Sequence, residues 1–111
     1  MTKTGLAGRT ADAAGEDDGY RSVGNWYVYI LACRDGSLYT GIARDPQKRF
    51  RQHQAGRGAR FTRAHPPLEI LGTLVCGDRS VASRLEYRIK RLSRKEKLAL
   101  AALWAERRTS A

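Results

Sequence analysis

WYVYILACRDGSLYTGIA, residues 26–43, is the stretch of sequence that decides the fold. Both of its halves are rich in aromatic and β-branched residues, which fit the pleated, half-buried surface of a strand. The dipeptide Asp35-Gly36 between them is a strong hairpin signal. We therefore predict two antiparallel strands, at residues 26–33 and 37–43, joined by a tight turn.

The length of that turn decides where two tyrosines point. A three-residue loop of Arg34, Asp35 and Gly36 would place Tyr29 and Tyr39 on one face of the sheet. A two-residue Asp35-Gly36 turn would place them on opposite faces, and the sequence leaves both arrangements open. Two half-buried strand aromatics are the purely structural alternative to a functional pair.

A helix and a third strand follow the hairpin. Asp45 can cap a helix at residues 46–55, Pro46 suits its first turn, and Gly56 can end it. Two prolines then lead into an apolar run that predicts a strand at residues 68–76. We expect the intervening segment, GRGARFTRAHPP, to be a basic and mobile loop.

Two further helices complete the predicted order. The first starts at Asp78 or Ser80, and a Ser93-x-x-Glu96 capping box opens the second. We expect their apolar residues to pack on the sheet, namely Val81, Leu85, Ile89 and Leu92 on the first and Leu98, Leu100, Leu103 and Trp104 on the second. The order β-β-α-β-α-α predicts an α+β fold, in which helices flank a three-stranded antiparallel sheet.

The length and net charge of the chain limit the class of protein to which it can belong. With 111 residues, of which 41% are hydrophobic, the chain is sized for one compact domain. We divide it into a disordered N-terminal extension at residues 1–24, which is poor in large apolar side chains, and a domain at residues 25–108. The formal net charge is +10 and the sequence pI is near 10.3, and the excess of basic residues belongs to the domain. This balance indicates a polyanionic partner, for which nucleic acid is the expected choice.

The sequence does not fit a membrane protein, a disulfide-bonded protein or a zinc-binding protein. No apolar run approaches the roughly 20 residues of a membrane span, and no signal peptide begins the chain, so we expect a cytoplasmic protein without a membrane partner. Cys33 and Cys76 lie in strand-like runs and are expected to be buried thiols, not a disulfide. Together with His53 and His65 they lack the paired spacing of a zinc site.

Three polar residues on the predicted helices could join the two tyrosines. Arg49 and His53 are four positions apart, so they share one face of the helix that follows the strand of Tyr39. Glu86 lies beside the apolar stripe of a helix crowded with basic residues, where it is either a salt-bridge partner or a metal-binding carboxylate. Taken singly, Arg49 fits a solvated charge and His53 a surface or capping residue.

The combined set is more informative than any of its members. The motifs VYI at residues 28–30 and YTG at residues 39–41 resemble the paired tyrosine motifs of the GIY-YIG nuclease family. Arg49, His53 and Glu86 fall where that family has its arginine, its histidine and its metal-binding glutamate. The predicted order of elements agrees with the family's fold, and the chain is most similar to the small stand-alone bacterial branch.

The resemblance extends from residue 26 to about residue 95 and implies a metal-dependent endonuclease that hydrolyses phosphodiester bonds, in DNA more than in RNA. Glu86 would hold one divalent cation, Mg²⁺ or Mn²⁺, and Arg49 would stabilise charge on the phosphate. Tyr29, Tyr39 and His53 would orient the attacking water or move its proton, which requires a tyrosine pKa below about 10. The sequence does not decide which tyrosine is the general base. All five side chains should converge on one shallow concave surface.

The sequence also departs from the family pattern. The second motif keeps Gly41 as its structural residue but has Thr40 where isoleucine is usual. Some members use a downstream asparagine, whereas the only asparagine here, Asn25, precedes the first strand. We also find none of the DNA-recognition domains of the larger nucleases. Cleavage is therefore expected to be weak, directed by the structure of the substrate rather than its sequence, or dependent on a protein partner.

A non-catalytic nucleic-acid-binding module with a remnant site is the alternative function. The side chains expected to contact phosphates are Lys48, Arg57, Arg60, Arg63, Arg84, Arg88 and Arg91. Such contacts explain affinity equally well with or without chemistry. The joint presence of the tyrosines, the arginine and the glutamate favours the nuclease. A protein-interaction domain built around the Trp104 helix is the third reading, and it fits less well because that helix is expected to pack on the sheet.

Overall fold

The structure is a computed structural model, and it describes residues 25–110. Its elements are β1 (Trp26–Cys33), β2 (Leu38–Ala43), α2 (Pro46–Gln54), α3 (Arg60–Ala64), β3 (Pro67–Cys76), α4 (Arg79–Lys90) and α5 (Arg94–Ser110). The three strands form one antiparallel sheet in the order β2-β1-β3. The predicted α+β fold is confirmed. The expected extension at residues 1–24 lies outside the described residues, and the domain boundaries stay predictions.

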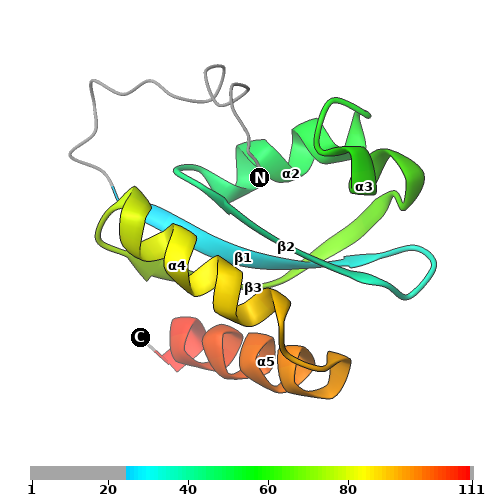
Figure 1. Cartoon of the computed structure of the whole chain (residues 1–111). Coiled ribbons are helices and arrows are strands. Elements are labelled where there is room, and N and C mark those ends of the chain that lie inside the picture. Colours follow the sequence, from blue (N-terminus) through cyan, green and yellow to red (C-terminus); the bar gives the residue numbers. More distant parts are fainter. Residues whose placement is uncertain (1–24, 111) are drawn as a thin grey trace.

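Helices cover both faces of the sheet (Figure 1). The α2 and α3 helices lie on one face, and α4 and α5 lie on the other. The hydrophobic core is divided in the same way, because side chains alternate between the two faces along β1. Tyr29 and Leu31 point toward α2, whereas Val28 and Ile30 pack with the apolar side chains of α4 and α5.

The hairpin turn has the longer of the two candidate loops. Ala32 pairs with Leu38, and the Cys33 N–H donates to the Ser37 carbonyl at 2.9 Å, which leaves three residues in the loop. Gly36 has φ 89° and donates its N–H to the Cys33 carbonyl at 2.9 Å. This left-handed conformation favours glycine. The register places the two tyrosines of the hairpin on the same face of the sheet.

Side-chain caps begin the three longer helices as the sequence predicts. Asp45 accepts a hydrogen bond from the backbone N–H three residues on, at 3.1 Å, and starts α2. Of the two candidates for α4, Asp78 and not Ser80 is the cap. Ser93 and Glu96 form the predicted capping box at the start of α5, each accepting from the other's backbone N–H.

The prediction of a mobile loop between α2 and β3 was wrong. The α3 helix lies within this segment, so the observed order is β-β-α-α-β-α-α. Thr62 on α3 is 1% exposed, and its hydroxyl contacts His53 on α2. The segment is ordered by this tertiary contact, and no local pattern of residues indicates it.

The predicted packing of the last two helices needs a second correction. Val81, Leu98 and Leu103 were expected to face the sheet but are 41%, 38% and 50% exposed. The buried faces of the two helices contain alanines instead, namely Ala82 on α4 and Ala101 on α5.

The expected packing of the Trp104 helix is confirmed for its central residues. Trp104 is 4% exposed, and α5 approaches β3 so closely that a Cβ on Gly72 would lie 2.6 Å from the Ala101 carbonyl oxygen. Such a close approach needs a small residue on each element. Within residues 25–110, no helix is both long enough and apolar enough to cross a membrane.

Both cysteines are free and buried, as predicted. Cys33 ends β1 and Cys76 ends β3. Burial raises the pKa of each thiol above its ordinary value of 9.0. The two therefore behave as small core residues at neutral pH.

Candidate active site

Three aromatic side chains meet above the sheet on the face covered by α2. Tyr29 comes from β1, Tyr39 from β2 and His53 from α2. The ring centroids are 6.3 Å apart for the two tyrosines, 6.0 Å for Tyr29 and His53, and 5.2 Å for Tyr39 and His53. The predicted cluster of two tyrosines and a histidine therefore exists, and the hairpin register creates it.

A buried chain of hydrogen bonds runs through this cluster. The Tyr29 hydroxyl lies 2.9 Å from His53 Nε2, and His53 Nδ1 lies 2.6 Å from the Thr62 hydroxyl. Thr62 donates to the Ala59 carbonyl at 3.0 Å, because a carbonyl can only accept. The threonine oxygen must then accept from His53 Nδ1–H. This assigns the proton of the neutral imidazole to Nδ1 and leaves Nε2 to accept from the Tyr29 hydroxyl.

His53 is neutral in this setting. Burial is the main cause that lowers its pKa, and the nearby Arg49 guanidinium lowers it further, to about 3. The imidazole is 1% exposed and carries no charge at neutral pH. It is therefore available to Tyr29 as a hydrogen-bond acceptor.

Two glycines make room for these side chains. A Cβ on Gly41 would lie 2.5 Å from the Tyr29 hydroxyl oxygen, and a Cβ on Gly58 would lie 2.0 Å from His53 Nδ1. Gly41 thus leaves space for the Tyr29 ring, and its role as the structural residue of its motif stays a prediction. Sequence reasoning missed Gly58 and Thr62, since both are needed only because the segment after α2 folds back over His53.

Arg49 belongs to the same group. It lies one turn before His53 on α2, is half-buried, and donates from Nη1 to the Gln52 side-chain oxygen at 2.9 Å. Its charge is close enough to lower the pKa of His53. The guanidinium therefore stands beside the aromatic cluster as a permanent cation that could pair with a phosphate.

Glu86 comes from the other layer. It lies on α4, which packs against β2 and β1, and the buried Ala82 and Ile89 are its neighbours one turn away. Its side chain is only 17% exposed and pairs with Lys90 Nζ at 3.2 Å. The structure thus groups four of the five predicted residues directly, and the convergence of Glu86 with them stays a prediction.

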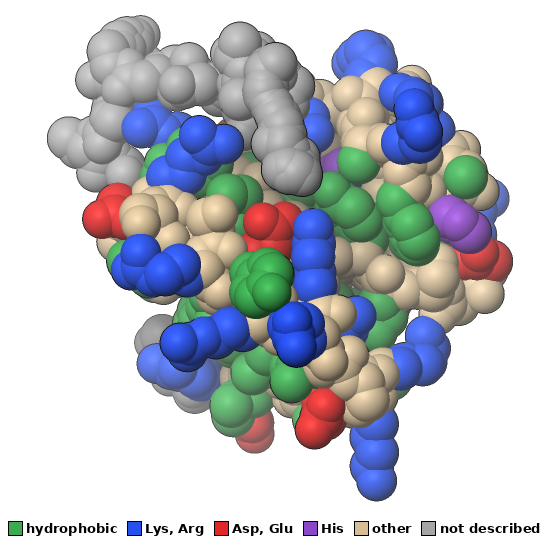
Figure 2. Space-filling model, viewed as in Figure 1, with side chains coloured by type: hydrophobic (Ala, Val, Ile, Leu, Met, Phe, Trp, Pro, Cys, Tyr) green, Lys and Arg blue, Asp and Glu red, His purple; other side chains and the backbone are tan. Residues whose placement is uncertain are grey.

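The predicted phosphate-binding residues lie on the surface. All seven are exposed: Lys48, Arg57, Arg60, Arg63, Arg84, Arg88 and Arg91. Lys and Arg side chains are spread over the face that Figure 2 shows, around a central area of hydrophobic side chains. Two of these arginines have partners on α4 itself, as Arg84 donates to Ser80 and Arg91 to the Tyr87 hydroxyl.

Comparison with known proteins decides the family. The model of the GIY-YIG catalytic domain matches residues 25–99, which include both strands of the hairpin and all of α2 and α4. The chain belongs to the GIY-YIG family. Its two motifs carry Tyr29 and Tyr39, the residues that meet His53 in the cluster.

Several similar proteins are named UPF0213 proteins. The UPF0213 protein Reut_B5558 of Cupriavidus pinatubonensis is 47% identical over 77 residues, which are 69% of this chain and 86% of that protein. The UPF0213 protein XAC3202 of Xanthomonas axonopodis pv. citri is 50% identical over 74 residues, 67% of this chain and 72% of that protein. The solution NMR structure of the UPF0213 protein BH0048 from Bacillus halodurans is 43% identical, covers 71% of this chain and 84% of that one, and has a TM-score of 0.45. As predicted, these relatives are small stand-alone members of the family.

The departures from the GIY-YIG pattern have plain structural settings. Thr40 is 4% exposed and pairs with Ile30 of β1, so it fills a core position as a β-branched residue. Asn25 is exposed and precedes β1.

A divalent cation at Glu86 would rely on few protein ligands. Among the described residues, no three His, Cys, Asp or Glu side chains are grouped so that they could hold a metal ion together. Mg²⁺ commonly binds through one or two carboxylates and completes its octahedral shell with water and substrate phosphate. A single, largely buried carboxylate such as Glu86 fits that mode of binding.

Proposed function

We propose that this protein is an endonuclease that hydrolyses phosphodiester bonds in nucleic acid with the help of a divalent cation. The observation that carries the proposal is the buried chain from Tyr29 through His53 to Thr62, set beside Arg49 in a domain of the GIY-YIG family. Titratable groups with strongly shifted pKa values cluster at functional sites, and the neutral His53 that accepts from the Tyr29 hydroxyl is such a group.

The chain of hydrogen bonds gives Tyr29 a defined role. Because its proton points at His53 Nε2, its oxygen can act only as a hydrogen-bond acceptor. Tyr29 is 1% exposed, so it would orient the attacking water once that water reaches the buried hydroxyl on substrate binding. Complete transfer of the phenol proton to His53 is unfavourable in the resting protein, because burial and the Arg49 charge lower the pKa of the imidazole to about 3. His53 therefore acts first as an orienting acceptor. A phosphate paired with Arg49 would offset one of the two causes that lower the pKa of His53, and so make the transfer easier during reaction.

The remaining roles fall to charged groups. Arg49 pairs with phosphate oxygens and stabilises the charge that develops on them. Glu86 would hold the divalent cation, which would neutralise charge on the phosphate and on the leaving oxygen. Lys90 Nζ lies 3.2 Å from a Glu86 carboxylate oxygen, so the lysine balances the negative charge of Glu86 when no divalent cation is bound.

We propose DNA as the substrate, chosen by its structure rather than by its base sequence. The exposed basic side chains support this, since contacts to phosphates position a nucleic acid without reading its sequence. The alternative remains a non-catalytic binding module, which the charge of +10 favours equally.

One experiment separates the two functions. Labelled duplex, branched and single-stranded substrates are incubated with wild type, Glu86→Gln and the control Glu106→Gln, in Mg²⁺, Mn²⁺ or EDTA. We expect wild type and the control, whose carboxylate lies exposed on α5, to cleave only with metal, and Glu86→Gln not to cleave. Affinities in EDTA should be equal for all three proteins. Equal cleavage by wild type and Glu86→Gln would refute the role of Glu86, and binding without cleavage by all of them would establish the binding module.

A further inference from the structure

A stack of aromatic rings leads from the candidate active site to the surface. The Tyr39 and Phe61 rings are 5.8 Å apart with an interplanar angle of 26°, and the Phe61 and His65 rings are 4.2 Å apart at 25°. Tyr39 is half-buried, Phe61 is 37% exposed, and the His65 side chain is 36% exposed. Tyr39 belongs to the aromatic cluster of the candidate site, whereas the mechanism proposed above leaves Phe61 and His65 without a role.

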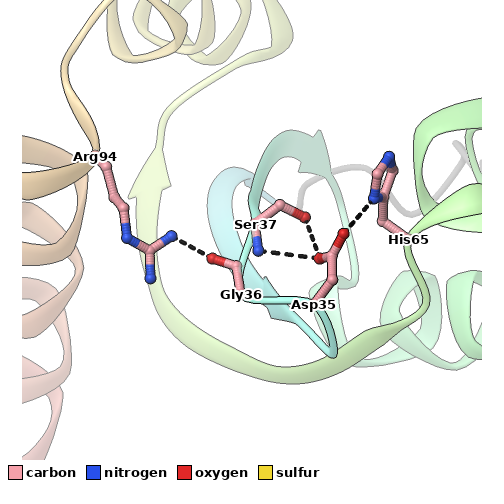
Figure 3. Close-up of polar contacts among 5 residues, drawn as sticks. All are labelled: Asp35, Gly36, Ser37, His65 and Arg94. Atoms are coloured by element: carbon pink, nitrogen blue, oxygen red, sulfur yellow. Dashed lines mark hydrogen bonds and ion pairs between the residues drawn. The ribbon is translucent and has the colours of Figure 1, made fainter.

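The outer ring of this stack is held in place. His65 Nδ1 lies 2.6 Å from an Asp35 carboxylate oxygen, and the other oxygen of Asp35 accepts from the backbone and the hydroxyl of Ser37 (Figure 3). The same hairpin tip is bound to α5, because Arg94 donates to the Gly36 carbonyl. The ring of His65 is therefore fixed before any ligand arrives.

Packing alone does not explain why these rings lie at the surface. The buried anchor of α3 is Thr62, not its neighbour Phe61. Exposed cations flank the stack in the chain, at Arg57, Arg60 and Arg63. On the face shown in Figure 2, hydrophobic side chains lie next to a histidine, with basic side chains around them.

Exposed aromatic rings among cations are the combination that binds unpaired nucleotides, because bases stack on the rings while phosphates pair with the cations. We propose that Phe61 and His65, continuing from Tyr39, form a stacking site for an unpaired nucleobase beside the scissile phosphate. Bases in an intact duplex are already stacked and cannot use this site without being unpaired. The site therefore selects single-stranded nucleic acid, or unpaired nucleotides in a branched one. For the position of the scissile phosphate this inference rests on the proposed nuclease function.

Binding in EDTA tests the site without any cleavage. The probes are single-stranded oligonucleotides that carry 2-aminopurine, made as DNA and as RNA, and the DNA duplex of the same sequence. We expect wild type to quench the fluorescence of the single-stranded probe of at least one sugar type and to bind it more tightly than the duplex. Phe61→Ala should weaken single-strand binding about tenfold and abolish the quenching, while duplex affinity stays within twofold. Phe61→Trp should retain both signals.

Three further variants serve as controls. Leu103→Ala removes an exposed apolar side chain from α5, on the other face of the sheet, and should behave as wild type. His65→Phe keeps the ring but loses the bond to Asp35, and should retain more single-strand affinity than His65→Ala. Equal affinity of Phe61→Ala and Phe61→Trp for the single strand, or equal losses for single strand and duplex, would overturn the proposal. Because all of these measurements use EDTA, they can succeed even if no cleavage is found, and they can fail even if the protein is a nuclease.

Discussion

Replacing Thr62 by valine is expected to disconnect His53 from its partner while the volume of the side chain is kept. Both residues are 1% exposed, so water does not replace the lost hydroxyl. The change removes the bond to His53 Nδ1 at 2.6 Å and the bond to the Ala59 carbonyl at 3.0 Å. A buried polar group left without a partner costs about 1–3 kcal/mol. In a domain of this size each kcal/mol lowers the Tm by about 4–8 °C.

The same substitution should change the chemistry of the site. Without Thr62 as an acceptor, the imidazole proton gains more by moving to Nε2, where the Tyr29 oxygen can accept it. Nitrogen-15 NMR of the histidine side chains reports the tautomer directly, and urea unfolding reports the stability. Cleavage should fall together with the loss of the Nδ1–H tautomer.

Thr62→Ser is the matched control, because it keeps the hydroxyl and loses only a methyl group. It should retain the Nδ1–H tautomer. The reasoning is refuted if Thr62→Val keeps this tautomer and is as stable and active as Thr62→Ser.

Three other measurements follow from the structure. Arg49→Ala should lower the single-turnover cleavage rate about a hundredfold and weaken binding much less, and Arg49→Lys should recover only part of the rate because it lacks the forked donor geometry. Since the pKa of His53 falls from 6.5 to about 3 on folding, the unfolded chain binds a proton that the folded chain does not. Stability to urea should therefore fall by roughly 1 kcal/mol per pH unit as the pH drops from 6.5 toward 3, and His53→Gln should remove this slope. Arg60→Ala should reduce the salt dependence of nucleic-acid binding by about one counterion, and an unchanged slope would show that Arg60 is merely solvated.

The parts of the fold that depend on local chemistry could be predicted from the sequence. Asp35-Gly36 marks the hairpin turn, and Asp45 and the Ser93–Glu96 box mark helix starts that the structure reproduces. These signals work because each residue acts on backbone groups within a few positions of itself. The length of the hairpin loop was a local choice that the sequence left open, and it decided whether the tyrosines share a face.

Contacts between distant segments could not be predicted in the same way. Thr62 and Gly58 matter only because α3 folds back over His53, and their own neighbours in the sequence do not indicate this. Leu85, Ile89 and Leu92 of the predicted apolar stripe of α4 pack in the core, and only its first residue was misplaced, for a related reason. A small residue, Ala82, lets the helix approach the sheet, whereas a pattern based on large apolar residues selects Val81.

The division of the core between the two faces of the sheet sets the order in which translation can complete the domain. The hydrogen bonds of the candidate site join residues between Tyr29 and Thr62. Trp104, which packs on the opposite face of the sheet, is synthesised later. A nascent polypeptide that ends just after α3 already contains these hydrogen-bonding residues, but its Val28 and Ile30 are still exposed to water. The core on the opposite face of the sheet is therefore complete only after α5 has left the ribosome.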